Sequence, residues 1–299
     1  MINPKETQRL VEHMYSKANI NKTVLKAIYD SEELAAMVDQ GIKLLEQYMD
    51  GEYYESKMKR IAQLWLLDTK EIVEEVLVTI IVIDKPMLFT SVVGQLAGVL
   101  NFDNKIEGAK TTAEILAVLS DLGAYELFKT GKYDSIQIQS FFEMDHQLMN
   151  FIRQTKYLPP MVCPPEVITS NYDSGYLTKK ESMILGWNAF HEGNICLDSI
   201  NKFNQVPLSL NVELLKTYSE APKQLLTDPE KQEQWEKFVT DSYVVYRDLV
   251  KQGNKFWLTH KVDKRGRTYA QGYHVSSQGN AFRKAILELH DKEVVEGVE

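Results

Sequence analysis

The sequence predicts a mainly α protein with a small α+β part toward its C-terminal end. Three observations carry this prediction. Apolar residues recur at helical spacing, behind capping residues, through most of the first 155 positions. Two Pro-Pro pairs then interrupt the helical pattern within residues 156–181. Beyond residue 255 the apolar period changes to that of two strands joined by a turn.

Four stretches of the first half predict helices. Residues 3–6 (NPKE) form a start signal, with a cap, a proline and a glutamate in order. Residues 21–50 carry apolar side chains at helical spacing. Residues 68–71 (DTKE) are a capping box in front of the apolar run Val76–Ile83. Residues 112–122 form a further helix, and a glycine follows it. We expect these stripes to be core, without a cofactor site.

The predicted secondary structure changes twice in the middle of the chain. Residues 156–178 are predicted to be extended because proline fixes φ and removes donors. Their many apolar side chains favour an ordered strap lying on a domain over a flexible linker. Helices are predicted again over residues 180–217, with a break at Pro207, and over Glu233–Lys251. The polar connection between them, residues 218–230, suggests an antiparallel helical projection.

The last segment predicts a strand, a turn, a strand and a helix. Residues 256–262 and Thr268–Val275 have strand character, and Asp263–Arg267 lies between them as a turn. Asn280 is expected to cap a final helix over Ala281–His290.

Composition excludes several protein classes. The 299 residues, 44% of them hydrophobic, predict one large domain or two to three smaller ones. The longest apolar run has eight residues, too few to span a bilayer, and no signal-peptide pattern opens the chain. Cys163 and Cys196 form neither a disulfide framework nor a zinc cluster, so we expect ordinary, partly buried thiols in a reducing cytosol.

Positive charge gathers near the C-terminal end of an acidic chain. Residues 251–284 hold eight cations and one anion, so their net charge is +7. The net charge of the whole chain is −8, which leaves −15 for the other residues. A basic patch on an acidic body suits a phosphate-binding site. The alternative is a solvated cationic face with no ligand.

The turn itself has a use in phosphate binding. Gly266 allows unusual φ and close approach of a ligand. Arg265 and Arg267 offer planar forks for phosphate oxygens, Tyr269 can stack, and Asp263 can anchor the turn. Such a site would hold a nucleic-acid backbone without distinguishing bases. Arg-Gly-Arg turns are also common on protein surfaces.

The arrangement around this turn resembles one motif region of the bacteriophage-type single-subunit RNA polymerases, the group of T-odd phage and mitochondrial enzymes. That region has an Asp-x-x-Gly-Arg core, here Asp263, Gly266 and Arg267, with Tyr269 following. A Gln-Gly-Asn sequence, here residues 278–280, opens the next helix. Lys264 departs from the aromatic residue often found at its position.

Upstream features agree in the same order. "LPPMVCPP" and "SGY" are similar to the family's Pro-rich strap and Gly-Tyr turn, with Ser174 in place of the first glycine. Asn201 and Asn211 match the ends of a helical motif in which Asn204 replaces a glutamine. The resemblance covers about residues 150–299.

The resemblance implies the N-terminal portion of a right-hand polymerase. Residues 1–155 would be a helical N-terminal domain, 156–181 the strap, 182–255 a thumb-like region, and 256–299 the first part of a palm. For Tyr269, packing inside the palm is the alternative role. The residues implied to contact the template strand and the RNA–DNA hybrid are Asp263, Lys264, Arg265, Gly266, Arg267, Tyr269, Gln278, Gly279 and Asn280.

The family's catalytic parts are not expected in this chain. Two-Mg²⁺ phosphoryl transfer needs a pair of carboxylates. In the family these lie downstream of the core motif, where only 32 residues remain, and no His-Asp-Asp sequence occurs. We therefore expect no catalytic or metal-binding residue here and a chain that is inactive alone.

Two interpretations of this absence stay open. In the first, the chain resembles the smaller, N-terminal subunit of a split, heterodimeric polymerase of N-four-like phages, acting in the cytoplasm of the infected bacterium. A second chain would bring Mg²⁺, the fingers and the rest of the palm across a large apolar interface. A single-strand-binding or recruitment factor is a further expected partner, since residues 1–150 are acidic. In the second, the chain is a non-catalytic, regulatory nucleic-acid-binding protein.

Overall fold

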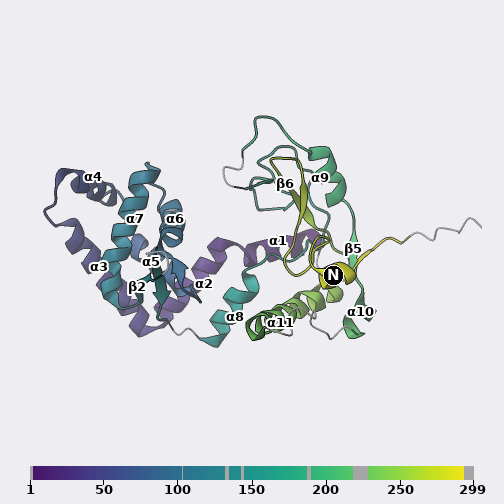
Figure 1. Cartoon of the computed structure of the whole chain (residues 1–299), viewed down its shortest axis with the longest axis horizontal. Helices are drawn as coiled ribbons and strands as arrows, with labels where there is room; N and C mark the ends of the chain where they lie inside the picture. Colours follow the sequence, from purple (N-terminus) through teal and green to yellow (C-terminus); the bar gives the residue numbers. More distant parts are fainter. Residues whose placement is uncertain are drawn as a thin grey trace, which may run out of the picture. The chain divides into compact units, whose positions relative to one another are not determined.

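The structure, a computed structural model, describes residues 3–102, 104–131, 135–142, 145–186, 190–217 and 228–292. It confirms the predicted fold class, since helices dominate and small sheets occur toward the C-terminal end (Figure 1). The chain divides into two compact units. We call Lys17–Arg153 the helical unit, and Met1–Ser16 together with Gln154–Glu299 the composite unit. The first helix thus belongs with the C-terminal half of the sequence.

The helical unit is built mostly from helices that follow one another closely. Its elements are α2 (Lys17–Asp30), α3 (Glu32–Met49), α4 (Glu55–Leu64), α5 (Thr69–Ile81), β1 (Met87–Leu88), α6 (Phe89–Leu100), α7 (Lys105–Leu119), the 3₁₀ turn Ser120–Leu122, β2 (Tyr125–Thr130), β3 (Ser135–Ser140) and α8 (His146–Thr155), whose last two residues belong to the composite unit.

Helix α5 is the centre of this unit. It packs against α2, α3 and α6, and it is apolar on most of its circumference, as a central helix must be. Val73, Val76 and Ile80 are completely buried. The predicted capping box is confirmed, because the Asp68 carboxylate accepts hydrogen bonds from the backbone N–H groups of Lys70 (2.8 Å) and Glu71 (3.3 Å). None of the described helices combines the length and apolar character of a membrane-crossing segment.

The helical unit also contains a sheet that the helical prediction for residues 1–155 missed. Strand β3 pairs antiparallel with β2 on one side and with β1 on the other, in the order β1-β3-β2. The signal was present in residues 135–140 (SIQIQS), which alternate apolar and polar side chains as a half-buried strand does. Ile138 is the fully buried member of that alternation.

Two helix boundaries in this unit differ from prediction because of caps. Residues 21–50 are not one helix, since Ser31 separates α2 from α3 and accepts a hydrogen bond from the Leu34 N–H (3.4 Å). Helix α7 begins seven residues before Thr112, because Asn104 accepts from the N–H groups of Ile106 and Glu107.

The composite unit combines short strands with a few helices. Its elements are α1 (Pro4–Met14), β4 (Ile184–Leu185), α9 (Leu197–Asn204), β5 (Leu208–Leu210), α10 (Val212–Thr217), α11 (Pro229–Lys251), β6 (Thr259–Asp263), β7 (Thr268–Gln271), α12 (Ala281–Ala285) and β8 (Leu287–Leu289). The strands form one sheet of order β4-β6-β7 and a second, two-stranded sheet β5-β8.

Helix α1 holds the proline-rich strap through two side chains. The predicted Asn3 cap is confirmed by a hydrogen bond from the Lys5 N–H (3.0 Å). On the buried side, Gln8 Oε1 accepts from the Val162 N–H (3.0 Å). The Glu12 carboxylate accepts from the N–H groups of Leu177 (2.9 Å) and Thr178 (2.6 Å), from the Thr178 hydroxyl (2.6 Å) and from Gln8 Nε2 (3.0 Å).

The strap is extended and ordered, as its composition predicts. Met161 and Trp257 exchange backbone hydrogen bonds of 2.9 and 2.8 Å, so the strap pairs with the chain just before β6. The Asn201 side chain of α9 forms two hydrogen bonds with the backbone of Ile168, donating to its carbonyl and accepting from its N–H. The strap is therefore held by contacts far apart in sequence, which a linker would lack.

Two predictions in the C-terminal third need correction. Residues 180–217 are not continuous helix but the series β4, α9, β5, α10. The final helix ends at Ala285 rather than His290, because Leu287–Leu289 form β8 and pair with β5. Ile286, between α12 and β8, is completely buried. Helix α11 starts at Pro229, and most of the polar connection, residues 218–227, lies outside the described residues.

Candidate nucleic-acid interface

The basic turn lies at the tip of a hairpin in the composite unit. Strands β6 and β7 pair antiparallel from Thr259↔Gln271 to Val262↔Thr268, and β4 pairs with β6 on the other side. The predicted strand–turn–strand is thus confirmed, with shorter strands. The buried side of β6, including Val262, is fixed in the core, so the tip is carried by a rigid element.

The backbone of the turn closes on itself. Asp263 N–H donates to the Arg267 carbonyl (3.0 Å), and Gly266 N–H donates to the Asp263 carbonyl (2.9 Å). Gly266 has φ +81°, the left-handed conformation that favours glycine. A Cβ there would meet only the sulfur of Cys196, at 3.4 Å. The glycine is therefore required by backbone conformation, and the rest of its surroundings is open.

The Asp263 carboxylate organises the turn, as the sequence led us to expect. Its Oδ1 accepts from the N–H groups of Arg265 (2.9 Å) and Arg267 (3.1 Å). Its Oδ2 accepts from Arg267 Nε (2.6 Å), Arg265 Nη2 (3.3 Å) and the Tyr269 hydroxyl (3.3 Å). Desolvation acts to raise the pKa of Asp263, but these hydrogen bonds and the Arg267 charge outweigh it and hold the pKa below its ordinary value.

Both arginines remain accessible although they pair with Asp263. The side chains of Arg265 and Arg267 are 71% and 55% exposed. The hydrogen bond to Asp263 raises the pKa of Arg267, which keeps it charged. Lys264 is exposed beside them. Three cations against one carboxylate leave the turn positive, with guanidinium edges facing solvent, which is the arrangement that phosphate oxygens require.

Tyr269 joins the same cluster from strand β7. Its hydroxyl points at Asp263, and the Arg267 guanidinium lies 5.8 Å from its ring centroid. Tyr269 is half-buried, and its ring supports the arginine. Packing and ligand stacking are compatible uses of this side chain.

The Gln-Gly-Asn sequence supports the hairpin and the following helix. The Gln278 amide accepts from the Ala270 N–H (3.0 Å) and donates to the Thr268 carbonyl (2.9 Å), so it covers the outer edge of β7. Gly279 leaves room for the Arg283 side chain. Asn280 caps α12 by accepting from the Arg283 N–H (3.0 Å), as predicted. These contacts give the three residues positioning roles.

Not all eight cations of the basic window form one patch. Lys261 pairs with Glu181 at 2.9 Å, and Lys255 lies 3.5 Å from Asp291. Arg283 stacks on Phe238, with 4.4 Å between its guanidinium carbon and the ring centroid. The sequence analysis did not foresee these contacts, because their partners come from other parts of the chain. The free positive charge at the hairpin is confined to residues 264–267.

Two buried histidines support the unit behind the hairpin. His260 Nδ1 lies 2.9 Å from Asn204 Oδ1, and His274 Nδ1 lies 2.9 Å from the Ser242 hydroxyl. Burial lowers the pKa of His260 and of His274 to about 4. Both imidazoles are therefore neutral near pH 7 and act as packed, hydrogen-bonded core groups.

The carboxylate at the turn is engaged by protein groups and, among the residues that the structure describes, is not clustered with other potential metal ligands. Within the described ranges, no three His, Cys, Asp or Glu side chains come together in a way that could hold a metal ion. Asp263 is committed to the two arginines and Tyr269. The Asp263 carboxylate therefore serves the turn and is not available as a metal ligand.

Comparison with known proteins shows a similarity to a polymerase. The chain is 23% identical over 161 residues to a probable DNA-directed RNA polymerase of Gelasinospora sp. (strain G114). This similarity supports a relationship to DNA-directed RNA polymerases. The match covers 50% of this chain but only 19% of the Gelasinospora protein, so the chain spans about a fifth of that relative. No family model matches the sequence.

Proposed function

We propose that this chain is one subunit of a two-chain DNA-dependent RNA polymerase, in which it grips the template strand and the RNA–DNA hybrid. The observation that carries the proposal is the turn 263–267, which presents two exposed guanidinium groups on a rigid hairpin. The similarity to a probable DNA-directed RNA polymerase supplies the nucleic-acid context.

The geometry favours binding to a backbone over recognition of bases. The turn offers planar guanidinium donors, which match phosphate oxygens, and phosphate contacts carry no sequence information. Asp263 fixes Arg267 through its side chain and backbone, so little freedom is lost when a phosphate binds. Arg267 is the residue that we expect to contribute most, with Arg265 and Lys264 beside it.

Catalysis is assigned to a partner chain. That chain would bring the Mg²⁺-binding carboxylates, the fingers and the remaining palm, while residues 256–299 would be the first part of the palm. The thumb-like role falls to residues 182–255. A single-strand-binding or recruitment factor is a further proposed partner, and the bacterial cytoplasm during phage infection is the proposed setting.

The role of the turn is tested with a short RNA–DNA hybrid that carries a single-stranded template extension. Arg265→Ala and Arg267→Ala, combined in the full chain, are expected to weaken binding about tenfold or more. The slope of log affinity against log salt should fall by about 1 for each lost phosphate contact. Fluorescence anisotropy over a salt series measures both quantities.

A matched control separates this role from general charge. Lys251→Ala combined with Lys284→Ala removes the same charge from exposed positions away from the turn. It should leave affinity within about twofold. Equal loss in both double variants would contradict a specific grip at the turn. Hybrid binding without RNA synthesis by any chain pair would favour the regulatory alternative.

A further inference from the structure

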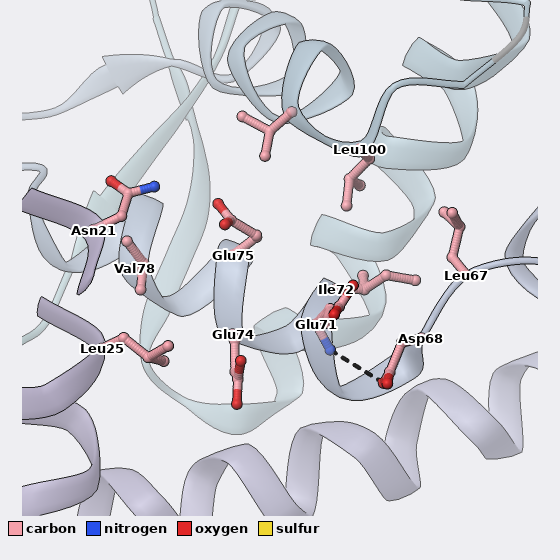
Figure 2. A pocket seen from close by; sticks show the side chains of 11 residues that line it. Asn21, Leu25, Leu67, Asp68, Glu71, Ile72, Glu74, Glu75, Val78 and Leu100 are labelled. Carbon is pink, nitrogen blue, oxygen red and sulfur yellow. Dashed lines mark hydrogen bonds between the residues drawn. The ribbon is translucent and has the colours of Figure 1, made fainter. Parts of the chain in front are cut away.

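A pocket in the helical unit combines an apolar lining with four acidic side chains. It has a volume of about 430 Å³ and lies between α2, α5 and the end of α6 (Figure 2). Its apolar lining consists of Leu25, Leu67, Ile72, Val78, Val99 and Leu100. Its acidic members are Asp68, Glu71, Glu74 and Glu75, and no lysine or arginine of the described residues lines it.

Three of the four carboxylates form no ion pair with any described cation. Only Glu74 has one, with Lys70 Nζ at 3.7 Å, and it also accepts a hydrogen bond from Tyr29. Glu75 extends from α5 into the space between Asn21 and Leu100 (Figure 2). Its Oε2 is buried and accepts no hydrogen bond from any described group. A buried acceptor without a donor is costly, so this oxygen calls for a cationic or hydrogen-bonding ligand.

Exposed apolar side chains neighbour the pocket-lining residues in the sequence. Trp65 and Leu66, which connect α4 to α5 and immediately precede the lining residue Leu67, are 57% and 84% exposed. Val99, which lines the pocket from the end of α6, is partly open to solvent as well. A small polycation would cover the acids but not these side chains, so the surface suits a longer occupant with apolar character.

We propose that this pocket is the docking site for a cationic amphipathic helix of a partner protein. A lysine or arginine of that helix would lie with its aliphatic stem against Ile72 and Val78 and its charge at Glu71 and Glu75. Apolar residues one turn away on the helix would cover Trp65 and Leu66. The acids repel phosphate, so nucleic acid is excluded as the occupant. This site is independent of the turn at residues 263–267.

The test uses a fluorescent model peptide with leucine and lysine at helical spacing, bound to the full chain. Glu71→Gln combined with Glu75→Gln should weaken binding about tenfold, and Leu66→Ser should also weaken it. Asp68 is left unchanged because it caps α5. The matched control is Glu32→Gln with Glu33→Gln, which removes two exposed acids from α3, outside the pocket. It should leave affinity within about twofold.

Each outcome bears on the proposal. Equal weakening by the control pair would overturn it, because the peptide would then be recognising net charge. An unchanged affinity with Leu66→Ser, together with equal competition by spermine, would also overturn it in favour of a small polycation. Selective loss in the pocket variants, with no competition from spermine at matched charge, supports it.

Discussion

Replacing Glu12 with alanine is expected to lower the free energy of unfolding of the composite unit by about 4 kcal/mol. Glu12 is 4% exposed and accepts four hydrogen bonds, three of them from the strap. Its removal leaves the N–H groups of Leu177 and Thr178 without an acceptor, and each buried, unpaired donor costs about 1–3 kcal/mol. Loss of the α1–strap contact adds to that penalty.

Hydrogen exchange read by mass spectrometry locates this effect. Peptides that cover residues 158–178 should lose protection in Glu12→Ala, while peptides from α5 in the helical unit should not. The control is Glu6→Ala on the exposed side of the same helix, which should change stability by about 0.5 kcal/mol or less. Equal effects of the two substitutions would show that Glu12 does not hold the strap.

Acidification is expected to destabilise the composite unit through His260 and His274. Burial lowers the pKa of each to about 4 from an ordinary value of 6.5. Above 6.5 both the folded and unfolded states carry neutral imidazoles, and the stability is fully present. As pH falls toward 4, the unfolded state binds protons first, so stability decreases by about 1.4 kcal/mol per pH unit for each histidine. The full loss is on the order of 3 kcal/mol per histidine.

The slope of stability against pH is the informative measurement. Urea unfolding at a series of pH values above about 5 stays clear of ordinary carboxylate titration. His274→Gln should reduce that slope by the contribution of about one bound proton, whatever the substitution does to absolute stability. Ser242→Ala removes the hydrogen-bond partner of His274 but keeps the titrating group. It should lower stability at every pH and leave the slope intact. An unaltered slope in His274→Gln would refute the linkage.

Much of the fold could be predicted because its signals are local. The caps at Asn3, Asp68 and Asn280 and the turn at Asp263–Arg267 each depend on neighbours within a few residues. Strand β8 shows the opposite case. Its apolar residues also fit a helix, and only the pairing with β5, almost eighty residues earlier, decides between them.

The candidate site was predictable in its centre and not in its surroundings. Asp263 has the anchoring role inferred from its position, and Gly266 has the unusual φ. Counting charge along the sequence overestimated the number of cations in the basic patch, because Glu181 neutralises Lys261 and aromatic rings cover Arg283. Contacts between distant segments carry no sequence signal of their own.

The most direct test of the two-chain polymerase is template-directed RNA synthesis by this chain together with its proposed partner. The partner is sought as the product of a neighbouring gene that carries the missing carboxylates and a His-Asp-Asp sequence. With Mg²⁺ and a single-stranded DNA template, the pair is expected to incorporate ribonucleotides while neither chain does so alone. Arg265→Ala with Arg267→Ala should reduce synthesis about tenfold without separating the pair. RNA synthesis by this chain alone, or none by the co-purified pair, would contradict the proposal.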